Sequence, residues 1–141
     1  MPEGATSVHL SALREDIRAS QGALAQFVPE KAVLSVEESP NGVLMSCRGE
    51  THRWIGVTTV EYGGGFNVGS LYATMEEGLA DSSVFTTQRE ASRWGGDRLV
   101  VEDAAGTRYT IRLLPQASKV QIAASSWCFT VEPGQTHGGQ F

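Results

Sequence analysis

Two residues with reactive side chains lie close together in the sequence, Cys47 and His52. A histidine beside a cysteine can deprotonate the thiol and create a nucleophile. That chemistry also needs a residue that orients the histidine and an oxyanion hole, and no pattern typical of either lies nearby. We therefore assign no catalytic residue.

Pairs of acidic residues offer a second chemistry, acid and base catalysis. They occur at Glu15-Asp16, Glu37-Glu38 and Glu76-Glu77. Adjacent side chains on a helix or strand diverge, so each pair is expected on a charged outer face and not around one substrate. The sequence holds no zinc-protease, serine-hydrolase, phosphate-loop or calcium-loop motif. We expect neither a cofactor nor a metal site.

An aromatic side chain in a polar, glycine-containing stretch is the best candidate for binding. Trp94 lies in this stretch, with Arg89, Arg93 and Arg98 around it in the sequence. Loops carry binding residues more often than strands do, and this combination could form a recognition patch. The alternative is that the indole of Trp94 folds back over the end of the sheet.

Two cysteines, Cys47 and Cys128, lie far apart in the sequence and in no metal-binding spacing. They form either a disulfide or two separate buried thiols, and we favour the disulfide. Closing so long a loop would stabilise the fold by about 4–5 kcal/mol. It would also indicate an oxidising compartment. No export signal is visible, which fits a cytosolic protein as well as a chain that starts after a removed signal.

The overall composition is that of one ordinary soluble domain. The chain has 141 residues, 40% of them hydrophobic, and a net charge of −5. An acidic chain has no broad attraction to nucleic acid or to anionic lipid, and no apolar run is long enough to cross a membrane. We expect one domain over residues 1–131 and a loose polar tail over residues 132–141.

Hydrophobic periodicity predicts an α+β fold in the order helix-βββ-helix-ββββ. Residues 39–42 have turn composition and would reverse the chain, so that the first three strands form a meander. We expect a two-layer sandwich, with two helices packed on one face of a mostly antiparallel sheet of about six to seven strands. The predicted helices cover residues 7–27 and 67–80, and the predicted strands cover residues 32–38, 43–48, 53–62, 83–89, 98–102, 108–114 and 119–131.

Several of these features occur together in a known class of proteins. Five features follow one another along the chain. They are a first helix with Leu10, Leu13 and Ile17, a Cys47 strand followed by Trp54, a middle helix, residues 103–109, and a closing Trp127-Cys128-Phe129. In this order the chain resembles the exported part of small actinobacterial envelope lipoproteins of unknown function. The resemblance implies a location outside the cytoplasmic membrane, a lipid anchor upstream, and a Cys47–Cys128 pair. It implies no catalytic residue.

These observations favour a non-catalytic secreted or envelope domain that binds a protein, glycan or lipid through a sheet face or the Trp94 loop. One alternative is a cytosolic accessory or chaperone-like domain with free thiols. Another is an enzyme whose site is assembled from Glu76, Glu77, His52 and Cys47. The ligand and the oligomeric state cannot be derived from the sequence.

Overall fold

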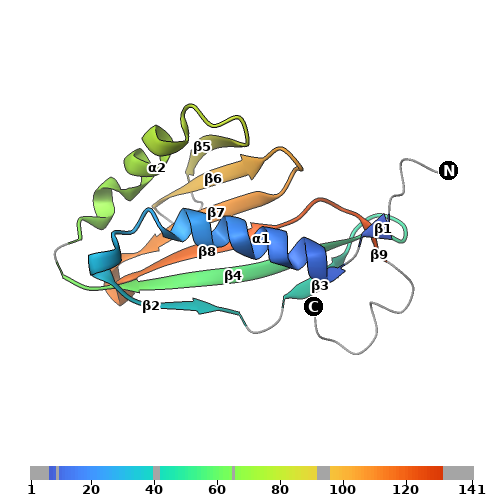
Figure 1. Ribbon diagram of the computed structural model, residues 1–141, viewed down its shortest axis with the longest axis horizontal. Helices are drawn as coiled ribbons and strands as arrows, with labels where there is room; N and C mark the ends of the chain where they lie inside the picture. The colour runs from blue at the N-terminus through green and yellow to red at the C-terminus, as the bar shows by residue number, and fades with distance from the viewer. Residues whose placement is uncertain (1–6, 9, 40–41, 65, 92–95, 132–141) are drawn as a thin grey trace.

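The computed structural model describes residues 7–8, 10–39, 42–64, 66–91 and 96–131 (Figure 1). It is a mixed α/β fold with two α-helices and a seven-stranded antiparallel sheet. The helices are α1 (Leu10–Ala25) and α2 (Leu71–Leu79), and short 3-10 turns cover Glu30–Ala32, Val68–Ser70 and Pro115–Ala117. The strands are β1 (Ser7–Val8), β2 (Val33–Glu38), β3 (Val43–Ser46), β4 (His52–Tyr62), β5 (Phe85–Ala91), β6 (Asp97–Asp103), β7 (Arg108–Leu114), β8 (Lys119–Ser125) and β9 (Thr130–Val131).

The longest strand of the large sheet is β4, which pairs with β2, β3 and β8. The sheet order is β2-β4-β8-β7-β6-β5, with β3 also paired to β4. Strands β5 to β8 are joined in sequence and each pairs antiparallel with the next. The two remaining strands, β1 and β9, form a separate parallel pair.

The predicted meander at the start of the sheet is wrong, because β2 and β3 do not pair with each other. Both run antiparallel to β4, β2 along its second half and β3 along its first half. Strands β2 and β3 therefore run in the same direction. Pro40 and Asn41 of the predicted turn lie outside the described residues. The reversal comes one segment later, where the Cys47 amide donates to the Thr51 carbonyl at 2.8 Å and Gly49 has a φ of 70°.

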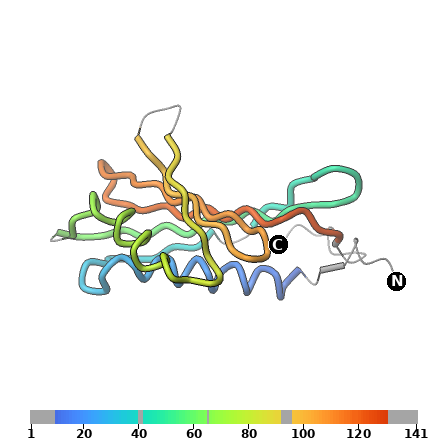
Figure 2. Tube along the Cα trace, turned by 90° about the horizontal axis from the view of Figure 1, so that it is seen from above, coloured from blue at the N-terminus to red at the C-terminus, as the bar shows by residue number. Residues whose placement is uncertain are grey.

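Helix α1 lies along one face of the sheet, which Figure 2 shows edge-on. Its apolar side buries Leu10, Leu13, Ile17 and Leu24. Gln21 is also fully buried, and its amide group donates to the carbonyls of Gly56 on β4 and Ile122 on β8, at 3.1 and 3.0 Å. A buried amide that pairs with two strands fixes the position of the helix as well as its distance from the sheet.

The first helix is shorter than the predicted span 7–27. Ser7 and Val8 are extended and pair with Thr130 and Val131. The predicted last strand is likewise divided, because β8 ends at Ser125 before β9 begins. Between them the chain is tied to the start of β4, where His52 and Phe129 exchange two backbone hydrogen bonds of 2.8 and 2.7 Å.

One core cluster collects side chains from both α-helices and from the central strands. On β7 and β8 more buried and more exposed side chains alternate, and Tyr109, Ile111, Val120 and Ile122 are fully buried. Trp54 on β4 is also fully buried, and the Arg18 guanidinium lies 5.1 Å from the centre of its ring. Its indole occupies the space that a side chain at Gly42 or Gly56 would need.

The predicted second helix, 67–80, begins as a 3-10 turn and becomes α-helical from Leu71. Asn67 caps this turn, since its side-chain oxygen accepts a hydrogen bond from the Gly69 amide at 3.1 Å. Neither described helix is long and apolar enough to span a membrane.

Candidate functional site

A pocket of about 270 Å³ lies between α1 and the turn that joins β6 to β7. One wall comes from the helix, and the opposite wall comes from the turn. Tyr109 of β7 and Trp127, next to the disulfide, complete the lining. The lining residues are Leu13, Asp16, Ile17, Ser20, Val84, Asp103, Ala104, Ala105, Thr107, Tyr109 and Trp127.

The helical wall follows from the spacing of its residues. Leu13, Asp16, Ile17 and Ser20 lie three or four positions apart, so they share one side of α1. Leu13 and Ile17 are buried in the core, whereas Asp16 is exposed. The helix thus brings a carboxylate and a hydroxyl to the border between the core and solvent.

The opposite wall is a tight turn organised by the Asp103 carboxylate. One of its oxygens accepts hydrogen bonds from the amides of Ala105 and Thr107, both at 3.0 Å. Gly106 supplies the positive φ of 97° that the turn requires. The second carboxylate oxygen accepts a hydrogen bond from the Tyr109 hydroxyl at 3.2 Å. Asp103 is therefore held in place by three neutral donors.

Tyr109 remains protonated at all physiological pH values. Burial of its side chain raises its pKa to about 12. A hydrogen bond with Ser20 opposes this shift, and the negative charges of Asp103 and Asp16 add to it. The protonated phenol donates its hydrogen bond to Asp103, and its ring is buried in the pocket wall.

Thr107 contributes a buried hydroxyl to the pocket wall. It is 1% exposed, and its hydroxyl has no hydrogen-bond partner among the described residues. A buried hydroxyl without a partner costs free energy, and most such groups in folded proteins are paired. The pocket thus combines two carboxylates, three hydroxyl side chains and two aromatic rings, without a basic residue in its lining.

On the other side of α1 lies a second hollow, an open groove of about 640 Å³. We call it the α1–β2 groove. Its lining is mostly apolar, and Val36 on the outer strand β2 is about half exposed, at 51%. Its lining residues are Gly22, Ala25, Gln26, Val28, Glu30, Val33 and Val36.

The predicted disulfide is confirmed, since Cys47 and Cys128 are bonded and their Cα atoms lie 6.1 Å apart. Cys47 is consequently not a free thiol next to His52. Within the part of the chain that the structure describes, no group of three or more His, Cys, Asp or Glu residues is arranged to hold a metal ion.

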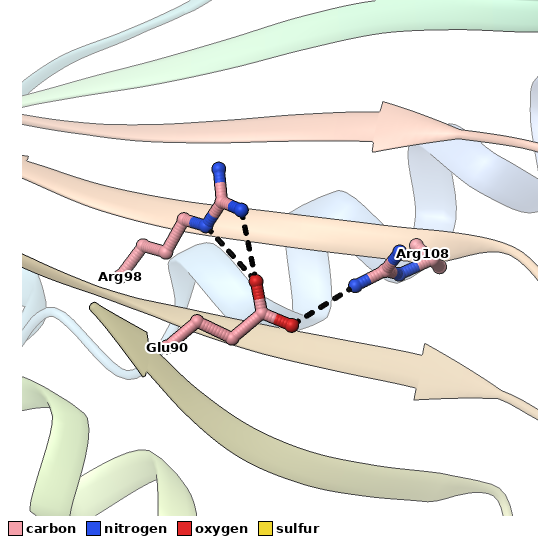
Figure 3. Close-up of polar contacts among 3 residues, drawn as sticks. All are labelled: Glu90, Arg98 and Arg108. Atoms are coloured by element: carbon pink, nitrogen blue, oxygen red, sulfur yellow. Dashed lines mark hydrogen bonds and ion pairs between the residues drawn. The ribbon is translucent and has the colours of Figure 1, made fainter. Parts of the chain in front are cut away.

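The arginines of the proposed binding patch are dispersed. Arg89 forms an ion pair of 2.8 Å with Glu76 of α2. Arg98 pairs instead with Glu90, the next residue along β5, and so lies on the opposite face of the sheet. Figure 3 shows Arg98 and Arg108 on either side of the Glu90 carboxylate, with α1 behind the strands. Arg93 and Trp94 lie outside the described residues, so the role of that loop stays a prediction.

The groups suggested for a scattered enzyme site are far apart. Glu76 and Glu77 belong to α2, at one end of the sheet, whereas His52 starts β4 at the other end (Figure 1). Glu76 is also engaged by Arg89. The two glutamates on α2 therefore lie away from His52.

The pocket was not predicted from the sequence. Asp16 was interpreted as part of an outer charged face, and Asp103 was given no role of its own. The sequence does contain a signal for each wall, a helix face that carries Asp16 and Ser20 beside core leucines, and an Asp-Ala-Ala-Gly-Thr turn before a β-strand. It contains no signal that the two walls face each other.

Comparison with known proteins gives no relative for this chain. No protein-family model, no curated protein and no solved structure matches it.

Proposed function

We propose that the chain is a non-catalytic binding domain that works outside the cytoplasm, secreted or held on the cell envelope, and takes a small molecule into the pocket beside α1. The observation that carries the proposal is the lining of that pocket. Carboxylates, hydroxyls and aromatic rings converge on one concave site, which is the composition of a ligand-binding pocket.

The unpaired hydroxyl of Thr107 supports the same conclusion. A ligand that accepts or donates one hydrogen bond there would satisfy a buried group that the protein leaves without a partner. The Asp103 carboxylate and the amides of Ala105 and Thr107 are joined by hydrogen bonds within the turn. They are held rigidly, which lowers the entropy that binding would cost.

The disulfide supports the location. Such bonds persist in oxidising compartments and are rare in the cytosol, so the bond between Cys47 and Cys128 weakly favours an extracytoplasmic protein. The resemblance to actinobacterial envelope lipoproteins agrees with this location. The cytosolic alternative assumed free thiols, and the enzyme alternative assumed a free Cys47.

The proposal treats the domain as a two-layer sandwich, with both helices on one face of the sheet. The pocket then lies between the layers, at the end of the molecule that the disulfide ties together. The opposite sheet face, which carries Arg98 and Arg108, is left to contact solvent or a protein partner.

The proposal is tested by NMR, with a set of small sugars, amines, amino acids and carboxylic acids added at millimolar concentration to the isotope-labelled protein. We expect at least one compound to shift the amide signals of residues 13–20 and 103–109. If no compound shifts these signals, or if all shifts fall on β2 and β3, the pocket is not the binding site.

A matched pair of variants separates binding from folding. Thr107→Val removes the unpaired hydroxyl from the pocket wall, and Thr58→Val removes another buried, unpaired hydroxyl, which does not line the pocket. Both variants should be as stable as the parent, since no hydrogen bond is lost. Only Thr107→Val should weaken binding of the compound found above.

A further inference from the structure

The charges around the pocket are unbalanced. Asp16 and Asp103 both line it, and its described lining contains no Lys, Arg or His. Asp103 is held by neutral donors only, and the ion pairs between described residues involve neither carboxylate. A bound molecule would therefore meet two negative charges that lack a cationic partner in the protein.

The remaining groups of the lining determine what kind of positive charge would fit. Trp127 is partly exposed, and Tyr109 presents a buried ring that stays neutral. Aromatic faces attract organic cations, above all ammonium groups, and this attraction grows as the site excludes water. The unpaired Thr107 hydroxyl adds a group that can bond a polar atom elsewhere on the same molecule.

The size of the pocket limits the molecule. Pockets for drug-sized ligands span roughly 300–1,000 Å³, and this one, at about 270 Å³, falls below that range. It suits a compact molecule and not a long chain or an oligosaccharide.

From these observations we infer that the ligand of the pocket is a small organic cation, with an ammonium group between the two carboxylates and the aromatic rings and a polar atom near Thr107. This inference rests on the proposed function and specifies its ligand class. A bare metal ion is a poorer match, because the two aromatic rings offer it no oxygen ligands.

The test uses two pairs of compounds that share a shape and differ in charge. Choline is compared with its neutral carbon analogue dimethylbutanol, and protonated glucosamine is compared with glucose. Each is titrated into the labelled protein while the amide signals of residues 13–20 and 103–109 are followed. We expect the charged member of at least one pair to bind at least about fivefold more tightly than its neutral analogue, and we expect salt at about 1 M to weaken that binding.

Asp16→Asn tests the carboxylate that contributes least to the fold, since Asp16 is exposed. We expect it to weaken binding of the charged compound about threefold to fivefold and to leave binding of the neutral analogue unchanged. Glu15→Gln is the matched control, because Glu15 is exposed on the same helix and does not line the pocket. It should bind like the parent.

Equal binding of charged and neutral members of both pairs, or tighter binding of the neutral members, overturns the cation inference and leaves the pocket as a binding site. If Asp16→Asn and Glu15→Gln weaken binding equally, the attraction is a general effect of the negative protein and the inference also fails. If no probe shifts the pocket signals, the cation inference fails, and the wider compound set then decides whether the proposed function fails with it.

Discussion

The two sides of α1 differ in how they are built. On one side the helix faces the pocket, where a buried tyrosine and an organised turn hold the Asp103 carboxylate by hydrogen bonds. On the other side it faces the α1–β2 groove, which is wider, mostly apolar and bounded by an outer strand with exposed side chains. A single helix thus separates a preorganised polar site from an unspecialised apolar hollow, so size alone does not identify a binding site.

The physical basis of the difference lies in the strands that each side meets. The pocket is bordered by β7, which pairs on both edges, and by a closed turn. The groove is bordered by β2, which pairs with β4 on one edge and has no described strand on the other. Groups on a doubly paired strand are fixed in place, whereas an outer strand has more freedom to move.

The largest expected effect comes from the disulfide, which lies next to the pocket residue Trp127. Replacing both Cys47 and Cys128 with serine should lower the free energy of unfolding by about 4–5 kcal/mol, because the unfolded chain loses a long covalent loop. Denaturation in urea measures the loss. Hydrogen exchange should increase more at residues 103–107 than in the groove segment 22–26, and the reverse order would contradict the comparison.

A smaller effect is expected at Gln21. Its buried amide joins α1 to the sheet at a position between the pocket and the groove. Gln21→Leu leaves the carbonyls of Gly56 and Ile122 without this donor and should cost about 1–3 kcal/mol. Denaturation experiments check the value. Hydrogen exchange should increase on both sides of the helix, and Gln26→Leu, an exposed change on the groove side, should have little effect. Equal losses for the two variants would show that Gln21 does not position the helix.

Removing the hydroxyl of Tyr109 affects the pocket side alone. Tyr109→Phe should cost about 0.5–1.5 kcal/mol at neutral pH, because Asp103 loses one donor. The groove should be unchanged, as judged by the amide signals of residues 22–26.

The same variant should alter the alkaline pH dependence of stability. The Tyr109 pKa is about 12 in the folded protein and near 10.0 when the chain is unfolded. Between these values the unfolded chain has released the proton and the folded chain has not, so the stability present below pH 10 falls as the pH rises towards 12. Burial raises the pKa of Tyr72 as well, so Tyr109→Phe should reduce this loss without abolishing it. An unchanged profile would place Tyr109 in a solvated site.

The smallest effect is expected in the groove. Val36→Ser changes an exposed side chain on the outer strand β2 and should alter stability by no more than about 0.5 kcal/mol. It should also leave binding in the pocket unaffected, which NMR titration would show. A loss of binding would place the functional site in the groove and reverse the comparison.

The sequence predicted much of the fold because local patterns reflect burial. The apolar spacing of Leu10, Leu13 and Ile17 in α1 depends on neighbouring residues, and their burial on one side of the helix is observed. The turn at residues 39–42 was predicted wrongly for the same reason. Its composition allows a reversal, but pairing of both β2 and β3 with β4 is a long-range interaction that overrides local turn propensity.

The pocket escaped prediction because its walls are distant in sequence. Asp16 and Asp103 have ordinary local contexts, a charged helix face and a turn, and only the packing of α1 across the sheet brings them to one hollow. The unpaired hydroxyl of Thr107 is a property of the packed interior and leaves no trace in the sequence. The disulfide was predictable as a pair, because two cysteines in strand-like segments allow few alternatives.

The bond between Cys47 and Cys128 also determines how the molecule would respond to a mechanical load. If the described chain is pulled at Ser7 and Thr130, the segment from β4 to β8 is bypassed, because the force passes through the disulfide. Only α1, β2, β3 and the short segment after Cys128 can be extended, by roughly 140 Å at about 3.5 Å per residue. The pulling force acts on α1 but not on the opposite pocket wall, which lies inside the disulfide loop. A ligand held between them would therefore raise the force at which the helix detaches.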